Sequence, residues 1–145
     1  MKREIKKNKN NLAVIILNYN DYKNTIRYTK EIINYKCIDK IIIVDNCSTD
    51  KSFKKISVLA NEKTDVIKSD VNKGYAYGNN FGINYLNEKY GKYQFIAISN
   101  PDVEVDEAAY NECLEFINKN RNIAIVAPRM YDKNDNPHPF SGWKL

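Results

Sequence analysis

Short apolar runs alternate with longer amphipathic stretches along this chain of 145 residues. The runs predict five strands, at 12–17, 40–45, 66–69, 93–99 and 123–127. Apolar residues recur at helical spacing between them, which predicts helices at 22–35, 75–89 and 106–118 and a further helix starting near 48–50. Strands that alternate with helices are typical of an α/β domain with a mostly parallel sheet and flanking helices.

The net charge of +5 is concentrated at the N-terminus. Five basic residues and one acidic residue in the segment 1–10 account for four of the five positive charges. The folded body therefore shows no basic face for nucleic acid, and no nucleic-acid partner is expected. The basic tail 1–10 is interpreted as a solvated terminus, with peripheral contact to anionic lipid as the alternative.

The apolar runs are too short to cross a bilayer, which takes roughly 18 residues or more. The stretch Leu12–Leu17 is also too short for a signal-peptide core, so the cytoplasm is expected, with the inner face of the membrane as an alternative. The cysteines are odd in number and show no CxxC spacing, which argues against a disulfide framework and a zinc site: Cys37, Cys47 and Cys113. The single histidine, His138, lies in a proline-flanked stretch and is expected in a loop.

Polar clusters follow the first four predicted strands, at 18–20, 45–48, 72–74 and 100–102. Ligands of open α/β sheets bind beyond the carboxyl ends of the strands, where loops lead into helices. Because the strands are expected to be parallel, all four clusters should meet at one edge of the sheet. This convergence predicts a binding site.

Each cluster also has a purely structural interpretation. Asn18 and Asn20 suit helix capping, as do Ser48 and Asp50. Asp102 could likewise cap the next helix, or it could bind a divalent metal together with substrate phosphates.

The segment 72–82 holds three glycines and three asparagines, and turns or caps explain some of them. The consecutive pair Asn79 and Asn80 lowers helix propensity, which is easier to understand if these amides bind something. No GxxxxGK[ST] motif is present, and no GxGxxG follows the first strand. Bound phosphates would therefore have to be met by a metal and by loop amides.

Four motifs, in order, carry a family resemblance: VIILNYN at 14–20, IVDNCSTD at 43–50, NKGYAYGNNFG at 72–82 and NPD at 100–102. Together they resemble the family 2 glycosyltransferases, in particular a rhamnosyltransferase-like branch in which the DxD motif reads NPD. The resemblance covers residues 11–129. It implies a GT-A fold, Rossmann-like and here truncated, with a nucleotide-sugar-binding subdomain at 11–129 and the start of an acceptor-side half at 130–145.

The resemblance also implies a donor, a metal and roles for individual residues. The donor would be a UDP- or dTDP-sugar, the cofactor Mn²⁺ or Mg²⁺, and the acceptor a glycan or lipid-linked molecule in polysaccharide or glycolipid synthesis. Asp102 would ligate the metal beside Asn100, and Asp45 would hydrogen-bond the base. The remaining donor-site residues are those expected to shape the base loop, to lie against the nucleoside or to pass over the ribose and diphosphate: Asn18, Tyr19, Asn20, Asn46, Ser48, Asn72, Gly74 and Asn79.

Enzymes of this kind act with inversion and carry their general base in a second half. That base is expected beyond Leu145, because Asp132 and Asp135 sit in a turn-like stretch. Without its cover, the predicted strand 123–127 would expose apolar surface and favour self-association. The alternative interpretation is a non-catalytic nucleotide-binding remnant or partner module. A receiver domain or a sugar nucleotidyltransferase is disfavoured, because neither an acidic pair nor a Gly-rich, Arg-containing loop follows the first strand.

Overall fold

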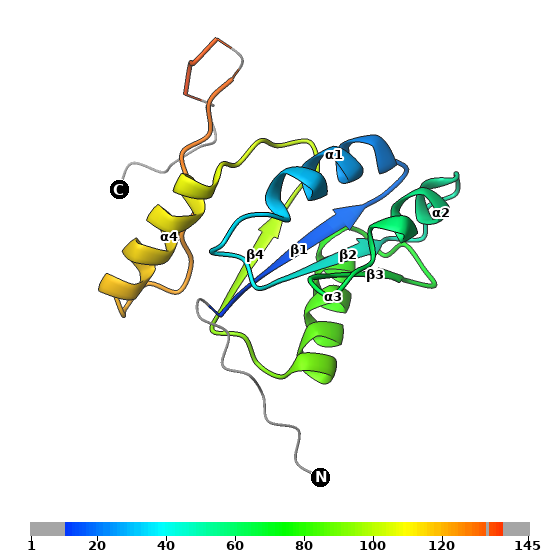
Figure 1. Cartoon of the computed structure of the whole chain (residues 1–145), viewed down its shortest axis with the longest axis horizontal. Helices are drawn as coiled ribbons and strands as arrows, with labels where there is room; N and C mark the ends of the chain where they lie inside the picture. Colours follow the sequence, from blue (N-terminus) through cyan, green and yellow to red (C-terminus); the bar gives the residue numbers. More distant parts are fainter. Residues whose placement is uncertain (1–10, 133, 138–145) are drawn as a thin grey trace. The chain divides into compact units, whose positions relative to one another are not determined.

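The structure is a computed structural model that describes residues 11–132 and 134–137. It divides into two compact units, Met1–Glu104 and Val105–Leu145, which are described separately. The elements follow in the order β1 (Leu12–Asn18), α1 (Tyr22–Ile32), β2 (Lys40–Asp45), α2 (Ser52–Ile56), a 3₁₀ turn η1 (Ser57–Leu59), β3 (Thr64–Lys68), α3 (Tyr75–Tyr90), β4 (Phe95–Ser99) and α4 (Glu107–Lys119) (Figure 1).

Four parallel strands form the sheet of the first unit, in the order β3-β2-β1-β4. In this register Ile16 of β1 lies between Ile43 of β2 and Ser99 of β4. The predicted mostly parallel α/β sheet is therefore confirmed. The chain runs outward from β1 to β3 and then returns to β4, so the strand order reverses between β1 and β4. Such a reversal opens a crevice at the carboxyl ends of the two strands.

Helices cover both faces of this sheet. Successive residues of a strand point to opposite faces, so Ala13 and Ile15 of β1 share a buried cluster with Leu86 of α3. Helices α1 and α2 pack against each other over the opposite face, where Tyr28 and Ile56 are fully buried (Figure 1). Right-handed crossovers require this arrangement, because β1 to β3 advance in one direction and β4 lies in the other.

Two glycines let α3 lie close to the sheet. A Cβ on Gly82 would come within 2.7 Å of Val44 Cγ2 and 3.0 Å of Ile15 Cγ2. A Cβ on Gly78 would come within 2.4 Å of Leu17 Cδ1. These positions account for two of the three glycines in the segment 72–82 by packing, whereas the sequence had suggested turns and caps.

The prediction of a fifth strand at 123–127 is wrong. Residues 123–127 pair with no strand of the described chain, and Ile125 is 86% exposed. An apolar run becomes a strand only when another strand completes its ladder of hydrogen bonds, and no described segment does so here. The expected self-association stays a prediction. The basic tail and His138 lie outside the described residues.

In the second unit, Asp106 accepts a bond from the Ala109 amide at 2.7 Å and so caps α4. Tyr131 and Pro137 form an isolated antiparallel bridge near the end of the described chain. Within the residues that the structure describes, no helix is both long enough and apolar enough to cross a bilayer.

Candidate functional site at the carboxyl edge of the sheet

A buried side-chain bond joins the carboxyl ends of β1 and β2. Asn18 Nδ2 donates to Asp45 Oδ1 at 2.8 Å and to Ser48 Oγ at 3.1 Å. The second carboxylate oxygen of Asp45 accepts from the Ser48 amide at 3.1 Å, and both Asn18 and Asp45 are fully buried. The acid that follows the apolar β2 thus organises the loops after both strands.

Asn20 fastens the same two loops nearer to the surface. Its backbone amide donates to Ser48 Oγ at 2.9 Å, and its Oδ1 accepts from the Thr49 amide at 2.9 Å. Asn20 has a φ of 54°, a left-handed conformation that asparagine tolerates better than most residues. These contacts bring the polar clusters after β1 and β2 together, as the sequence predicted.

The capping interpretation fails for these residues. Helix α1 is capped by Asp21, whose side chain accepts from the Asn24 amide. Ser48 bonds to Asn18 and Asn20 instead of capping α2, although the Asp50 carboxylate does accept from the Ser52 amide at 2.8 Å. Asn18, Asn20 and Ser48 therefore serve the junction between loops.

Asn46 extends the junction to the loop after β3. Its Nδ2 donates to Asn72 Oδ1 at 3.1 Å and to the Gly74 carbonyl at 3.4 Å. Its Oδ1 accepts from Ser69 Oγ at 3.3 Å. Asn72 Oδ1 also accepts from the Gly74 amide at 2.9 Å, which holds the turn into α3. The loops after β2 and β3 thus meet at one buried amide.

Helix α3 begins at this junction without a side-chain cap. Gly74 precedes it with a φ of 89°, a conformation that favours glycine. Asn79 is 3% exposed and donates to the Tyr75 carbonyl at 3.0 Å, while its Oδ1 is buried without a partner among the described residues. The amino end of a helix attracts anions, because its first amides are unpaired and its dipole is positive there. The arrangement suits a phosphate-bearing ligand.

Tyr19 and Asp102 are exposed at the same edge. The Tyr19 side chain follows β1 and is 48% exposed. Asp102 lies in the loop after β4, the strand that pairs with β1, and is also exposed. Asp106 caps α4, so the Asp102 side chain does not serve as the cap of that helix.

The donor set at Asp102 fits a hard divalent cation. Asp102 and the neighbouring Asn100 are exposed and offer oxygen atoms, the ligands that Mg²⁺ and Mn²⁺ prefer. Over the described ranges, no cluster of three or more His, Cys, Asp or Glu side chains could hold a metal alone. A metal here could complete its shell with ligand phosphates and water, which is the common arrangement for Mg²⁺.

Arg27 is a residue of this edge that the sequence did not single out. Its Nη2 donates to the Pro101 carbonyl at 3.2 Å and to the Val103 carbonyl at 3.4 Å. These carbonyls flank Asp102. Arg27 is 74 and 76 residues away from its two partners, so no local pattern could have revealed the contact.

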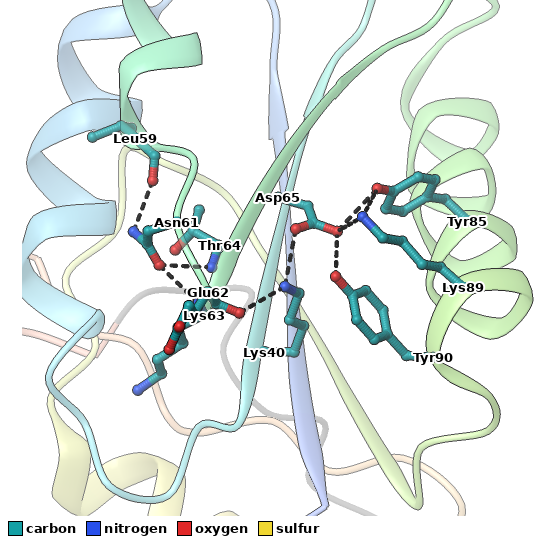
Figure 2. A network of polar contacts seen from close by, with 10 residues as sticks. All are labelled: Lys40, Leu59, Asn61, Glu62, Lys63, Thr64, Asp65, Tyr85, Lys89 and Tyr90. Atoms are coloured by element: carbon teal, nitrogen blue, oxygen red, sulfur yellow. Dashed lines mark hydrogen bonds and ion pairs between the residues drawn. The ribbon is translucent and has the colours of Figure 1, made fainter. Parts of the chain in front are cut away.

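The most strongly perturbed carboxylate lies at the opposite edge of the sheet. Figure 2 shows Asp65, near the start of β3, between Lys40 on one side and Tyr85, Lys89 and Tyr90 on the other. Its oxygens accept from Lys40 Nζ at 2.9 Å, Tyr85 at 2.9 Å, Lys89 at 3.0 Å and Tyr90 at 2.8 Å. Burial raises the pKa of Asp65, but these four hydrogen bonds outweigh it and lower the pKa to about 2. The cluster ties α3 to β2 and β3 and is structural.

The fold defines a class, the doubly wound α/β domains, and the polar candidate site lies at the carboxyl edge of the sheet, where such domains bind ligands. The family model described as glycosyl transferase family 2 matches residues 13–143, and the chain belongs to that family. The predicted resemblance is confirmed at this level; the rhamnosyltransferase-like branch stays a prediction.

Two known proteins illustrate the similarity. The chain is 27% identical over 133 residues to the low-salt glycan biosynthesis hexosyltransferase Agl10 of Haloferax volcanii. This alignment covers 88% of the present chain and 41% of Agl10. The chain shares its fold with the mannosyltransferase PcManGT from Pyrobaculum calidifontis, solved in complex with GDP-Man and Mn²⁺. That match has a TM-score of 0.63 and 14% identity, and covers 74% of this chain and 32% of the other. The chain thus spans less than half the length of either protein.

Proposed function

We propose that this chain forms the donor-binding part of a glycosyltransferase that takes a nucleoside-diphosphate sugar with a divalent metal. The sugar would pass with inversion to a glycan or lipid-linked acceptor in polysaccharide or glycolipid synthesis. One observation carries the proposal: polar loops from four parallel strands end at one edge, and those after β1, β2 and β3 are bonded to one another.

We propose a role in holding the donor for each loop of this network. Tyr19 offers an exposed ring beside the Asn18–Asp45 junction, where a nucleoside can lie against it. Asn72, Gly74 and Asn79 surround the uncapped start of α3, where ribose and diphosphate oxygens find amide donors.

Asp45 is proposed to act at the base. Both of its oxygens already accept bonds from Asn18 and Ser48, and its side chain is fully buried. Its main contribution on this geometry is to fix the loop, and a direct bond to the base requires a remaining lone pair.

Asp102, with Asn100 beside it, would hold the Mn²⁺ or Mg²⁺. Lewis-acid stabilisation of the departing diphosphate is what a bound divalent metal supplies to such a reaction. The general base that deprotonates the acceptor is still predicted to lie outside these 145 residues. UDP and dTDP are the proposed nucleotides. GDP belongs in the test because the mannosyltransferase of the same fold was solved with GDP-Man.

Calorimetric titration with UDP, dTDP and GDP, each with and without Mn²⁺, tests the donor site. We expect one nucleotide to bind more tightly with metal, and Asp102→Asn to abolish the metal-dependent part. Glu107→Gln is the matched control, because it removes an exposed carboxylate from the first turn of α4 instead of from the loop after β4. Wild-type protein that is folded by circular dichroism and binds none of the three nucleotides would contradict the proposal.

Turnover is measured separately from binding. Slow hydrolysis of a bound nucleotide sugar, lost in Asp102→Asn, supports a transferase site. Tight binding with no release of sugar over days supports the alternative of a nucleotide-binding module that acts with another chain.

A further inference from the structure

The loop that carries Asp102 is bonded to a side chain of α1. Arg27 projects from α1, and its Nη2 donates to the carbonyls of Pro101 and Val103, one on each side of Asp102. Its Nη1 also donates to Glu104 Oε1 at 3.5 Å. One guanidinium thus binds three groups of the loop that carries Asp102, from Pro101, Val103 and Glu104.

Within the described residues, the backbone of this loop makes few bonds of its own. Pro101 has no amide hydrogen to donate, and the Val103 amide donates to the Asn100 carbonyl at a long 3.5 Å. The side chains of Asn100 and Asp102 are exposed. The contacts from Arg27 are therefore a principal restraint on where the Asp102 carboxylate lies.

Helix α1, which carries Arg27, is firmly held in the fold. Tyr28 and Ile32 anchor α1 in the core with no exposed surface, and Asp21 caps its start. Arg27 itself is half-exposed, at 39% of its side-chain surface, so its bonds to the loop compete with water. An arginine can serve two carbonyls and a carboxylate because its five N–H donors are fixed in one plane.

We propose that Arg27 is a positioning residue that holds the loop 100–104 so that Asp102 meets the metal and the donor diphosphate together. The inference rests on the proposed function. A single carboxylate is a weak metal ligand unless the phosphates bind at the same time, so a loosened loop must be ordered on binding, at a cost in affinity. The loss should fall on metal-dependent nucleotide binding and spare binding without metal.

Three variants separate this role from a general effect on charge or folding. Arg27→Met keeps much of the aliphatic stem and removes every donor. Arg27→Lys keeps the charge but cannot reproduce the planar set of donors. Glu31→Gln is the matched control, because it removes the 3.6 Å ion pair between Glu31 and Arg27 on α1 and leaves both carbonyl bonds in place.

The first measurement is native-state cleavage by a glutamyl endopeptidase after Glu104, followed by mass spectrometry, with no ligand present. The loop must open locally before it is cut, so the rate reports the restraint directly. We expect Arg27→Met to be cut about five to ten times faster than wild type, because bonds from a charged donor are lost. Arg27→Lys should be intermediate and Glu31→Gln unchanged. Equal cleavage of wild type and Arg27→Met would overturn the proposal.

The second measurement is titration of the same proteins with the nucleotide that wild type binds, with and without Mn²⁺. We expect Arg27→Met to weaken metal-dependent binding about tenfold and metal-free binding less than about twofold, since only the metal loop is loosened. Equal losses in both titrations would overturn the positioning role. If wild type shows no metal-dependent binding, the proposed function fails, and the cleavage assay alone then decides whether Arg27 restrains the loop.

Discussion

Asn18 Nδ2 and Asp45 Oδ1 lie 2.8 Å apart in a fully buried bond that joins the carboxyl ends of β1 and β2. The carbonyl oxygen of the same side chain, Asn18 Oδ1, accepts a hydrogen bond from Thr25 Oγ1 at 2.9 Å. Asn18 is therefore bonded to the end of β2, to the loop that follows β2 and to α1. Such a fully bonded buried side chain fixes the spacing of the loops around it.

Asn18→Ala should destabilise the chain and weaken donor binding together. It leaves Asp45 Oδ1 without its amide partner, and a buried unsatisfied group costs about 1–3 kcal/mol, whereas Thr25 Oγ1 keeps its bond to the Asp21 carbonyl. We expect the free energy of unfolding to fall by about 1–3 kcal/mol in urea titration. Asn80→Ala is the control, because Asn80 is an exposed residue inside α3 and alanine favours the helix. A loss in Asn18→Ala no larger than in Asn80→Ala would contradict the structure.

Gly82→Ala should destabilise the chain despite its gain in helix propensity. The new methyl would lie 2.7 Å from Val44 Cγ2, a buried β-branched side chain with little freedom to move. Overpacking costs about 1–3 kcal/mol, against about 1 kcal/mol gained from replacing a helical glycine. Asn84→Ala, at an exposed position of the same helix, should be neutral or stabilising in thermal unfolding. A Gly82→Ala variant with a raised melting temperature would show that α3 can shift away from the sheet.

Sequence periodicity was enough for the sheet and most helices because their apolar faces are formed by local spacing. The strand predicted at 40–45 matches β2, and the helix predicted at 75–89 matches α3 to within one residue. The carboxyl-edge clusters could also be placed, because parallel strands must end together. The cap of α1 shows the limit: the sequence suggested Asn18 and Asn20, whereas the structure has Asp21 as the cap.

Features that depend on distant partners could not be predicted. The run 123–127 has the composition of a strand, but strand formation requires a partner that the sequence pattern does not identify. The contacts of Arg27 with the loop after β4, and of Lys40 with Asp65, join residues that are dozens of positions apart. Gly82 was noticed, but its reason is a close approach to the sheet that no turn rule contains.

The Asp65 cluster should make the chain sensitive to acid. The folded pKa of Asp65 is lowered to about 2 from its ordinary value of 3.8, because hydrogen bonds from Lys40, Lys89 and the two tyrosines outweigh burial. A lowered folded pKa stabilises the protein above the unfolded pKa, and the stabilisation is lost as pH falls through the folded pKa. We expect about 2 kcal/mol of the unfolding free energy to disappear between about pH 5 and pH 2.

Asp65→Asn tests this by removing the titrating group. Urea titrations across the acid range should show a lower unfolding free energy at pH 7, because Lys40 loses its carboxylate partner at a side chain only 5% exposed. They should also show a flatter slope between about pH 5 and pH 2. Glu115→Gln is the control, since Glu115 pairs with Lys119 on the surface of α4 with 65% of its side chain exposed. An unchanged acid slope in Asp65→Asn would assign the acid sensitivity to other carboxylates.

The three cysteines give a probe of the donor site that does not depend on turnover. Cys37 is buried, whereas Cys47 and Cys113 are partly exposed. Burial, together with the nearby Glu112 carboxylate, raises the pKa of the Cys113 thiol, so a smaller fraction of it is the reactive thiolate near neutral pH. Cys47 lies in the loop between Asn46 and Ser48, with a φ of 59° and its Sγ 3.5 Å from the Asp70 carbonyl.

Alkylation followed by mass spectrometry should therefore label Cys47 first and Cys37 last. If the donor site is as proposed, nucleotide with Mn²⁺ should protect Cys47 and leave Cys113 unaffected, because Cys113 belongs to α4, which carries none of the proposed donor-site residues. At a nucleotide concentration ten times its Kd, labelling of Cys47 should slow about tenfold when the bound form does not react. Asp102→Asn should remove the metal-dependent part of this protection. Equal protection of Cys113 and Cys47 would mean that the nucleotide acts through the stability of the whole chain. Protection of Cys47 alone would instead mean that the nucleotide binds at the loop that Asn18 and Asp45 hold in place.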